Sequence, residues 1–174
     1  KQLIKFFKRQ VKSYGNQTII NGSTLRFDLT ESPFGPSVKI KQLFSDLDIN
    51  KLVHYPDPDP LMLKKTIADV FSVDTKSISI GNGVSELIDR IANTFLDETR
   101  CALVLTPTFF RFIESSAKVG AKLIEVKCKF KESFNITNEI LRIWLKVIKE
   151  KQPDVIWICN PNNPTGVIVS KEFI

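Results

Sequence analysis

Three polar loops that follow apolar segments carry the residue types from which a ligand site could be built. They read GNGVSE (81–86), TPTFFRF (106–112) and NPNNPTG (160–166). In the first loop, glycines allow a close backbone approach and the start of a helix offers free N–H groups, which suits an anion or a phosphate. In the second, phenylalanine rings could stack on a flat ligand. In the third, the amide of Asn163 could donate and accept hydrogen bonds at once.

Each of these loops also has an explanation that needs no ligand. Two glycines can serve a tight turn, aromatic side chains at helical spacing belong more often to a core, and asparagine side chains often bind their own backbone in turns. The first loop lacks the third glycine of a dinucleotide fingerprint, and the following strand, CALVLT, does not end in an acidic residue. These two departures argue against a nucleotide-dependent oxidoreductase.

The periodicity of apolar residues predicts the elements that must position these loops. Helices are expected over residues 38–46, 61–71, 85–95, 109–119 and 140–149. Strands are expected over residues 77–80, 101–105, 121–126 and 155–159. Ser85 is expected to be an N-cap, and Gly120 to end the helix before it. Alternating strands and helices predict an α/β fold with a mostly parallel sheet flanked by helices, and ligands bind such sheets at the carboxyl ends of the strands.

The expected helices present apolar residues along one face. These are Leu61, Leu63, Ile67, Val70 and Phe71 in one helix, Leu87, Ile88, Ile91, Ala92 and Phe95 in the next, and Leu141, Trp144, Leu145 and Ile148 in the last. Such stripes predict that each helix turns this face toward the core.

Composition indicates a single globular protein of ordinary size. The chain has 174 residues, 43% hydrophobic and 25% charged, which is enough for a real core, and its apolar runs are too short to span a bilayer. The net charge is +6, with basic clusters at 5–9 and 127–131. No nucleic-acid recognition module accompanies these clusters, which favours solvated faces. Cys101, Cys128 and Cys159 share no disulfide or metal spacing, which favours a reduced cytoplasmic protein without a metal site.

Five segments, taken in order, resemble the fold-type I pyridoxal-phosphate enzymes of aminotransferase class I and II. They are LTESPFGPS (29–37), HYPDPD (54–59), GNGVSELI (81–88), TPTFF (106–110) and NPNNPTG (160–166). The branch they resemble includes histidinol-phosphate aminotransferase and threonine-phosphate decarboxylase. The resemblance covers residues 25–174. It implies an arm and small-domain segment over 1–50 and an incomplete large cofactor-binding domain over 51–174.

The resemblance implies pyridoxal 5'-phosphate as cofactor and a role for each matching residue. The amides of Val84 and Ser85, with the Ser85 hydroxyl, would bind the cofactor phosphate. Phe109 takes the place of the aromatic residue, commonly tyrosine, that stacks on the pyridine ring. Asn163 would bind the phenolic oxygen of the cofactor.

Two further residues extend the implied site beyond these loops. Tyr55 matches the tyrosine that reaches the phosphate of the neighbouring subunit's cofactor, which implies a homodimer. Ser32 stands near the substrate, where the family often has asparagine. The implied substrate is a small molecule, an amino acid or a phosphorylated amine, with no nucleic acid or membrane as a partner.

The resemblance also implies that residues needed for turnover lie beyond NPNNPTG. In the family these are an aspartate beside the pyridine nitrogen, the lysine that attaches the cofactor as a Schiff base, and an arginine for the substrate carboxylate. We assign no catalytic residue within the 174 residues, regard the C-terminal half as absent, and expect this chain by itself to be inactive. The alternatives are a decarboxylase of the threonine-phosphate type and a non-catalytic remnant or interaction module.

Overall fold

The computed structural model describes residue 32 and residues 34–174. The chain divides into two units, Lys1–Pro56 and Asp57–Ile174. The predicted arm over residues 1–24 and most of the segment after it lie outside the described residues. In the first unit, helix α2 (Val38–Ser45) is followed by the 3₁₀ helix η1 (Ile49–Val53). The Ser37 hydroxyl caps α2 by accepting a hydrogen bond from Ile40 N–H, and the helix predicted over 38–46 is confirmed.

The second unit is an α/β arrangement around a three-stranded parallel sheet. Its helices are α3 (Leu61–Phe71), α4 (Gly83–Phe95), α5 (Phe110–Lys118) and α6 (Asn138–Lys151), with short 3₁₀ turns η2 (Thr75–Ser77), η3 (Phe130–Glu132) and η4 (Lys171–Phe173). Its strands are β1 (Cys101–Thr106), β2 (Lys122–Lys127) and β3 (Val155–Trp157), in the order β2-β1-β3. The predicted α/β class and the parallel pairing are confirmed.

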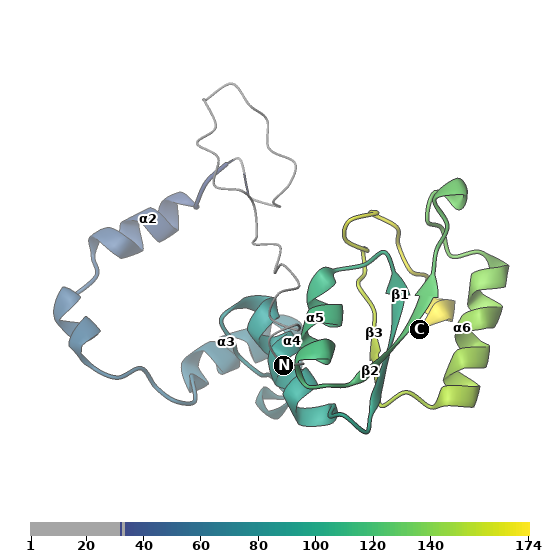
Figure 1. The fold of residues 1–174 in the computed structure, drawn as a ribbon. Helices are drawn as coiled ribbons and strands as arrows, with labels where there is room; N and C mark the ends of the chain where they lie inside the picture. The colour runs from purple at the N-terminus through teal and green to yellow at the C-terminus, as the bar shows by residue number, and fades with distance from the viewer. Residues whose placement is uncertain (1–31, 33) are drawn as a thin grey trace, which may run out of the picture. The chain divides into compact units, whose positions relative to one another are not determined.

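Helices cover both faces of this sheet, with α4 and α5 on one side and α6 on the other (Figure 1). Alternate residues of β1 point to opposite faces. Ala102 and Val104 therefore join the core beneath α4 and α5, whereas Leu103 joins the core beneath α6. All three are fully buried. The sheet is thus a central layer that aligns the carboxyl ends of its strands at one edge.

Local sequence explains where the helices around the sheet begin and end. Thr137 caps α6 by accepting from Ile140 N–H, as β-region cap residues with a hydroxyl do. Gly120 follows α5 with φ of +79°, a value that glycine adopts without strain, so the predicted end signal is confirmed.

The strand predicted over 77–80 is wrong. Ser77 ends the η2 turn, and residues 78–80 form no strand. An extended segment becomes a strand only when another strand pairs with its backbone, and no strand of the described residues lies beside this one. Instead, the Ile80 carbonyl accepts a hydrogen bond of 3.0 Å from the Arg90 guanidinium of α4. The last strand is also shorter than predicted, because β3 ends at Trp157.

All three predicted apolar stripes are only partly buried. In α3, Ala68 is the buried residue, whereas Val70 and Phe71 are 71% and 70% exposed. The reason is that α3 lies apart from the sheet (Figure 1). In α4, Ile88 and Ala92 are buried as predicted, but Ile91 and Phe95 are exposed. In α6, Trp144 is buried as predicted but Leu145 is exposed, because the inward face of this helix is narrower than its run of apolar residues.

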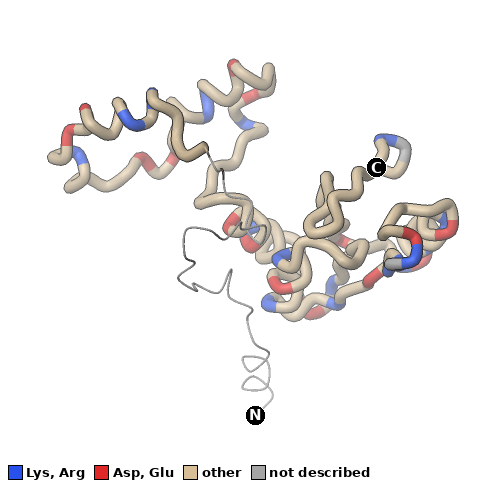
Figure 2. Tube along the Cα trace, turned by 90° about the horizontal axis from the view of Figure 1, so that it is seen from above, with Lys and Arg blue, Asp and Glu red and all other residues tan. Residues whose placement is uncertain are grey.

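Charged residues of both signs are interspersed along the described chain (Figure 2). In the second basic cluster, Lys129 forms ion pairs with Glu132 and Glu139. The first basic cluster, over residues 5–9, lies outside the described residues. Within the described ranges, none of the helices has the length and apolar character needed to cross a bilayer.

Candidate ligand site at the carboxyl ends of the strands

The NPNNPTG loop follows β3, and two of its three asparagines hold the loop itself together. The Asn160 amide donates to Val169 C=O at 3.3 Å and accepts from Val169 N–H at 3.0 Å, as a paired backbone group would. Further up the loop, Asn162 N–H donates to Val167 C=O at 2.8 Å, and Gly166 N–H donates back to Asn162 C=O at 2.6 Å. The side-chain contacts of Asn160 with the Val169 backbone confirm the structural interpretation of the loop for that residue.

Asn163 differs from its two neighbours because it keeps its side chain free. It is exposed, and its amide has no hydrogen-bond partner within the described part of the chain. Its backbone N–H donates to the Cys159 sulfur at 3.4 Å, and its peptide bond to Pro164 is cis. The loop therefore offers to solvent one amide that can both donate and accept.

Phe109, in the loop after β1, is half-buried and held by other rings. It meets Phe110 and Phe112 edge-to-face, with centroids 5.4 and 5.9 Å apart. Phe112 in turn stacks on Trp157 of β3 at 4.9 Å. Phe112 is a core residue, as the structural interpretation expected, but Phe109 keeps part of its ring accessible. A ligand ring could pack against it.

The GNGVSE loop leads into α4, whose first turn contains both Val84 and Ser85. The prediction that Ser85 is the N-cap is wrong, because the helix begins at Gly83 and Asn82 takes the cap position. Gly83 has φ of +76°, which strains any other residue, and a Cβ on Gly81 would come within 2.9 Å of Leu87 Cδ2. The turn thus requires glycine at position 83, whatever the loop binds, and a side chain at position 81 would require Leu87 to move.

The start of α4 has the donor groups that an anion needs. The first N–H groups of an α-helix have no acceptor within the helix, and those of Val84 and Ser85 donate to no other backbone group of the described residues. The positive end of the helix dipole adds to their attraction for negative charge. These two N–H groups fit a phosphate.

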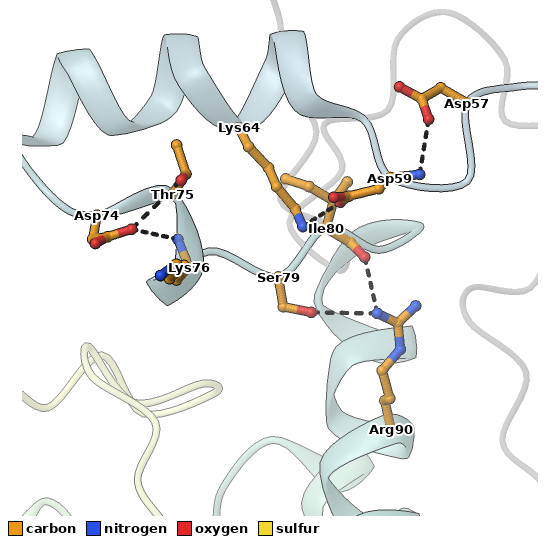
Figure 3. Close-up of polar contacts among 9 residues, drawn as sticks. All are labelled: Asp57, Asp59, Lys64, Asp74, Thr75, Lys76, Ser79, Ile80 and Arg90. Carbon is orange, nitrogen blue, oxygen red and sulfur yellow. Dashed lines mark hydrogen bonds and ion pairs between the residues drawn. The ribbon is translucent and has the colours of Figure 1, made fainter.

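A charged pair stands beside this helix start. Glu86 accepts from both the backbone and the side-chain nitrogen of Asn82 at 2.7 Å, and it forms an ion pair with Arg90. The backbone N–H of Asn82, then its side chain, then Arg90 lower the pKa of Glu86. Arg90 also donates to the Ser79 hydroxyl and the Ile80 carbonyl (Figure 3). The Glu86 carboxylate is therefore ionised but neutralised.

A second polar cluster fixes α4 against α5. The Arg111 guanidinium of α5 donates to the Asp89 carboxylate of α4 at 2.7 Å, and the Ser115 hydroxyl donates to the other oxygen of Asp89. Arg111 also pairs with Glu114, and its side chain is only 13% exposed. Asp89 lies one turn beyond Ser85, and Arg111 lies two residues beyond Phe109. The cluster thus links α4, whose first turn contains Ser85, to α5, which follows Phe109.

A cleft opens between the loops at the carboxyl ends of the strands. It is lined by Thr108 and Asn162, by the thiols Cys128 and Cys159, and by apolar side chains that include Ile136. Burial, followed by the nearby Glu132 carboxylate, raises the pKa of the Cys128 thiol. Within the described chain no group of acidic, histidine or cysteine side chains could hold a metal ion. The cleft does not include Val84, Ser85, Phe109 or Asn163, so it borders the predicted site without coinciding with it.

The structure joins two of the three predicted loops directly. The Asn162 amide of the third loop contacts Pro107 and Thr108 of the second. Tyr55 and Ser32 belong to the first unit. Tyr55 is 99% exposed, and the Ser32 hydroxyl accepts from Phe34 N–H at 3.4 Å.

Sequence reasoning missed the residues that hold the site rather than face it. Asn162 and Thr108 lie beside assigned residues but drew no assignment of their own. Glu86 and Arg90 had a visible signal, since their spacing of four along a helix favours an ion pair. Nothing in the sequence indicates that Arg90 also reaches back to residues 79 and 80.

The chain matches the family model for aminotransferase class I and II over residues 25–174. It is 32% identical over 152 residues to a histidinol-phosphate aminotransferase of Ruminiclostridium cellulolyticum, covering 86% of this chain and 42% of that relative. The chain therefore spans about two fifths of the length of that relative.

Solved structures have the same fold. The histidinol-phosphate aminotransferase of Clostridium acetobutylicum is 25% identical, with a TM-score of 0.68 over 81% of this chain and 39% of that one. The enzyme of Sinorhizobium meliloti, in complex with pyridoxal-5'-phosphate, is 20% identical, with a TM-score of 0.66 over 77% of this chain and 35% of that one. The likeness confirms that the fold is part of that of the fold-type I pyridoxal-phosphate enzymes. The chain belongs to the class I and II aminotransferase family.

Proposed function

We propose that the protein is a pyridoxal-phosphate-dependent aminotransferase of the histidinol-phosphate type. It would transfer an amino group between an amino acid or amino phosphate and a 2-oxo acid. The observation that carries this proposal is the exposed Asn163 amide, which has no hydrogen-bond partner within the described residues, whereas the Asn160 and Asn162 side chains are bonded to Val169 and to Pro107. An exposed amide that can both donate and accept is suited to a ligand. The similarity to histidinol-phosphate aminotransferases supports the reaction class.

Four residues of this chain would hold the cofactor. The N–H groups of Val84 and Ser85 at the start of α4, with the Ser85 hydroxyl, bind its phosphate. The Phe109 ring packs against the pyridine, and the Asn163 amide donates to the phenolic oxygen. When bound, pyridoxal phosphate supplies the electron sink of the reaction. The protein's part is to orient that group and exclude water from it.

The subunit arrangement and the substrate side belong to the same proposal. Tyr55 reaches the cofactor phosphate of the partner subunit in a homodimer, and its full exposure within one chain is compatible with that role. Ser32 stands near the substrate, which is an amino acid or a phosphorylated amine. Three free thiols support a reducing compartment, the cytoplasm.

The lysine that attaches the cofactor is, in this proposal, not among the 174 residues. The match to about two fifths of a relative supports this. The 174-residue chain by itself would therefore show no amino transfer.

Product analysis tests the proposed reaction. The full-length protein, incubated with pyridoxal phosphate, histidinol phosphate and a 2-oxo acid, should form an amino acid from the 2-oxo acid without release of carbon dioxide, whereas the 174-residue chain should form none. Carbon dioxide release from threonine phosphate without a new amino acid would identify a decarboxylase instead. Failure to retain pyridoxal phosphate during gel filtration would favour the non-catalytic interaction module.

A further inference from the structure

The side chain of Asn162 joins the loop that carries Phe109 to the loop that carries Asn163. Its Nδ2 donates to Pro107 C=O at 2.9 Å and to the Thr165 hydroxyl at 2.8 Å, and its Oδ1 accepts from the Thr108 hydroxyl at 2.9 Å. Because a carbonyl oxygen only accepts, the contact with Pro107 fixes which end of the amide is nitrogen. Both amide protons and the amide oxygen of Asn162 are thus committed to partners.

These contacts lie next to the two proposed ring-binding residues. Thr108 immediately precedes Phe109, and Asn162 immediately precedes Asn163. The Asn162–Thr108 bond is part-buried and joins residues 54 positions apart, so it is a tertiary contact and not a local turn. A bond shielded from water holds its geometry better than an exposed one. A shift of either loop would break it.

We propose that Asn162 and Thr108 form a clamp that sets the separation of Phe109 and Asn163, and that this clamp positions both for the cofactor ring. The inference rests on the proposed function, because it assigns the clamp a role in binding pyridoxal phosphate. It makes Asn162 and Thr108 positioning residues. The phosphate-binding N–H groups of α4 make no contact with the clamp and should be independent of it.

The first part of the test asks whether the clamp couples the two loops. The urea midpoints of Thr108→Val, Asn162→Ala and the double variant are compared by tryptophan fluorescence. The midpoint shift of the double variant should be clearly smaller than the sum of the single shifts, because each substitution removes the same bond. Additive shifts would overturn the clamp.

The second part asks whether the clamp serves the ring and not the phosphate. The Kd of pyridoxal phosphate, by equilibrium dialysis with folded protein, should rise about five- to tenfold in Thr108→Val, the effect of one lost hydrogen bond. Thr108→Ser keeps the hydroxyl and should restore the Kd. Inorganic phosphate, followed by the NMR shifts of the Val84 and Ser85 amides, should bind Thr108→Val as it binds the unchanged protein.

Thr94→Val is the matched control, because among the described residues the Thr94 hydroxyl bonds only to Arg90 C=O, within α4. It should leave the Kd of pyridoxal phosphate unchanged. An unchanged Kd in Thr108→Val, or equal weakening for inorganic phosphate, would overturn the positioning role while leaving the proposed function intact. If the unchanged protein retains no pyridoxal phosphate, the proposed function fails, and the clamp's role in cofactor binding fails with it.

Discussion

At the scale of single residues, three identical amides in one loop have different tasks. Asn163 alone keeps its side chain free, so its replacement should affect a ligand more than the fold. Asn163→Ala should weaken pyridoxal phosphate binding about tenfold or more, because it removes a hydrogen bond to a charged oxygen. The urea midpoint should barely move. Equilibrium dialysis and urea unfolding measure the two effects.

Asn138→Ala is the control for that experiment. Asn138 is exposed and is the first residue of α6, which covers the face of the sheet opposite to α4 and α5 (Figure 1). Its replacement should leave cofactor affinity unchanged. If Asn163→Ala instead lowers the urea midpoint and leaves cofactor affinity intact, Asn163 belongs to the loop structure, as Asn160 and Asn162 do.

Glu86 makes the free energy of unfolding depend on pH, and the sign of this dependence follows from the lowered pKa of Glu86. A carboxylate whose pKa is lower in the folded state adds stability above its unfolded pKa, and that stability is lost as pH falls through the folded value. Glu86→Gln lacks this contribution. The free energies of unfolding of Glu86→Gln and the unchanged protein should therefore differ above pH about 4.3, the value of an unperturbed glutamate. The difference should shrink below that pH, where urea titrations at several pH values would detect it. A difference that grows toward acid would contradict the assignment.

The sequence could locate the polar loops but could not divide tasks within them. Asn160, Asn162 and Asn163 look alike in NPNNPTG. Their hydrogen-bond partners distinguish them: the Asn160 side chain bonds to Val169, and the Asn162 side chain bonds to Pro107. Pro107 is more than 50 positions from Asn162 in the sequence, and the pairing of β1 with β3 brings the two residues together. Side-chain tasks that depend on tertiary contacts cannot be read from local sequence.

At the scale of elements, a buried hydrogen bond ties β3 to α5. The Trp157 indole N–H donates to the Ser116 hydroxyl at 3.0 Å, and that hydroxyl donates to Phe112 C=O at 2.7 Å. Ser116 is fully buried. Ser116→Ala would leave the indole N–H without an acceptor and should cost about 1–3 kcal/mol of unfolding free energy. Urea unfolding followed by tryptophan fluorescence measures this loss.

Ser170→Ala serves as the control for Ser116→Ala. Ser170 is exposed, and its side chain makes no capping bond to η4. The free energy of unfolding should stay within about 0.5 kcal/mol of the original value. Equal losses from both substitutions would mean that the Trp157 bond adds nothing to the joining of β3 and α5.

Elements with their own stop signals and strong periodicity were predictable, and those that depend on a partner were not. Helices α4, α5 and α6 lie where the sequence placed them, within a few residues. Residues 77–80 show the opposite case. Ile78 and Ile80 alternate with serines as in a strand, but strand propensity expresses packing against neighbours. Among the described residues, the group that bonds to residues 79 and 80 is the Arg90 guanidinium, and no strand lies beside them.

At the scale of the whole molecule, the first unit shows apolar surface that its own described residues do not bury. No residue of α2 is buried, and Leu43 and Phe44 are 65% and 71% exposed. A helix of eight residues is barely stable without packing. The proposed homodimer would supply that packing. We therefore expect the two exposed side chains to be part of the contact between subunits.

Phe44→Glu tests this expectation, because a buried charge at the contact would disfavour association. Sedimentation equilibrium should give a dimer for the unchanged protein and a dimer Kd at least about tenfold higher for Phe44→Glu. Leu145→Glu is the matched control, since Leu145 is a similarly exposed apolar residue, on α6 of the second unit. It should leave the dimer intact. The reverse result, a dimer weakened by Leu145→Glu but not by Phe44→Glu, would move the subunit contact from α2 to the α6 side of the sheet.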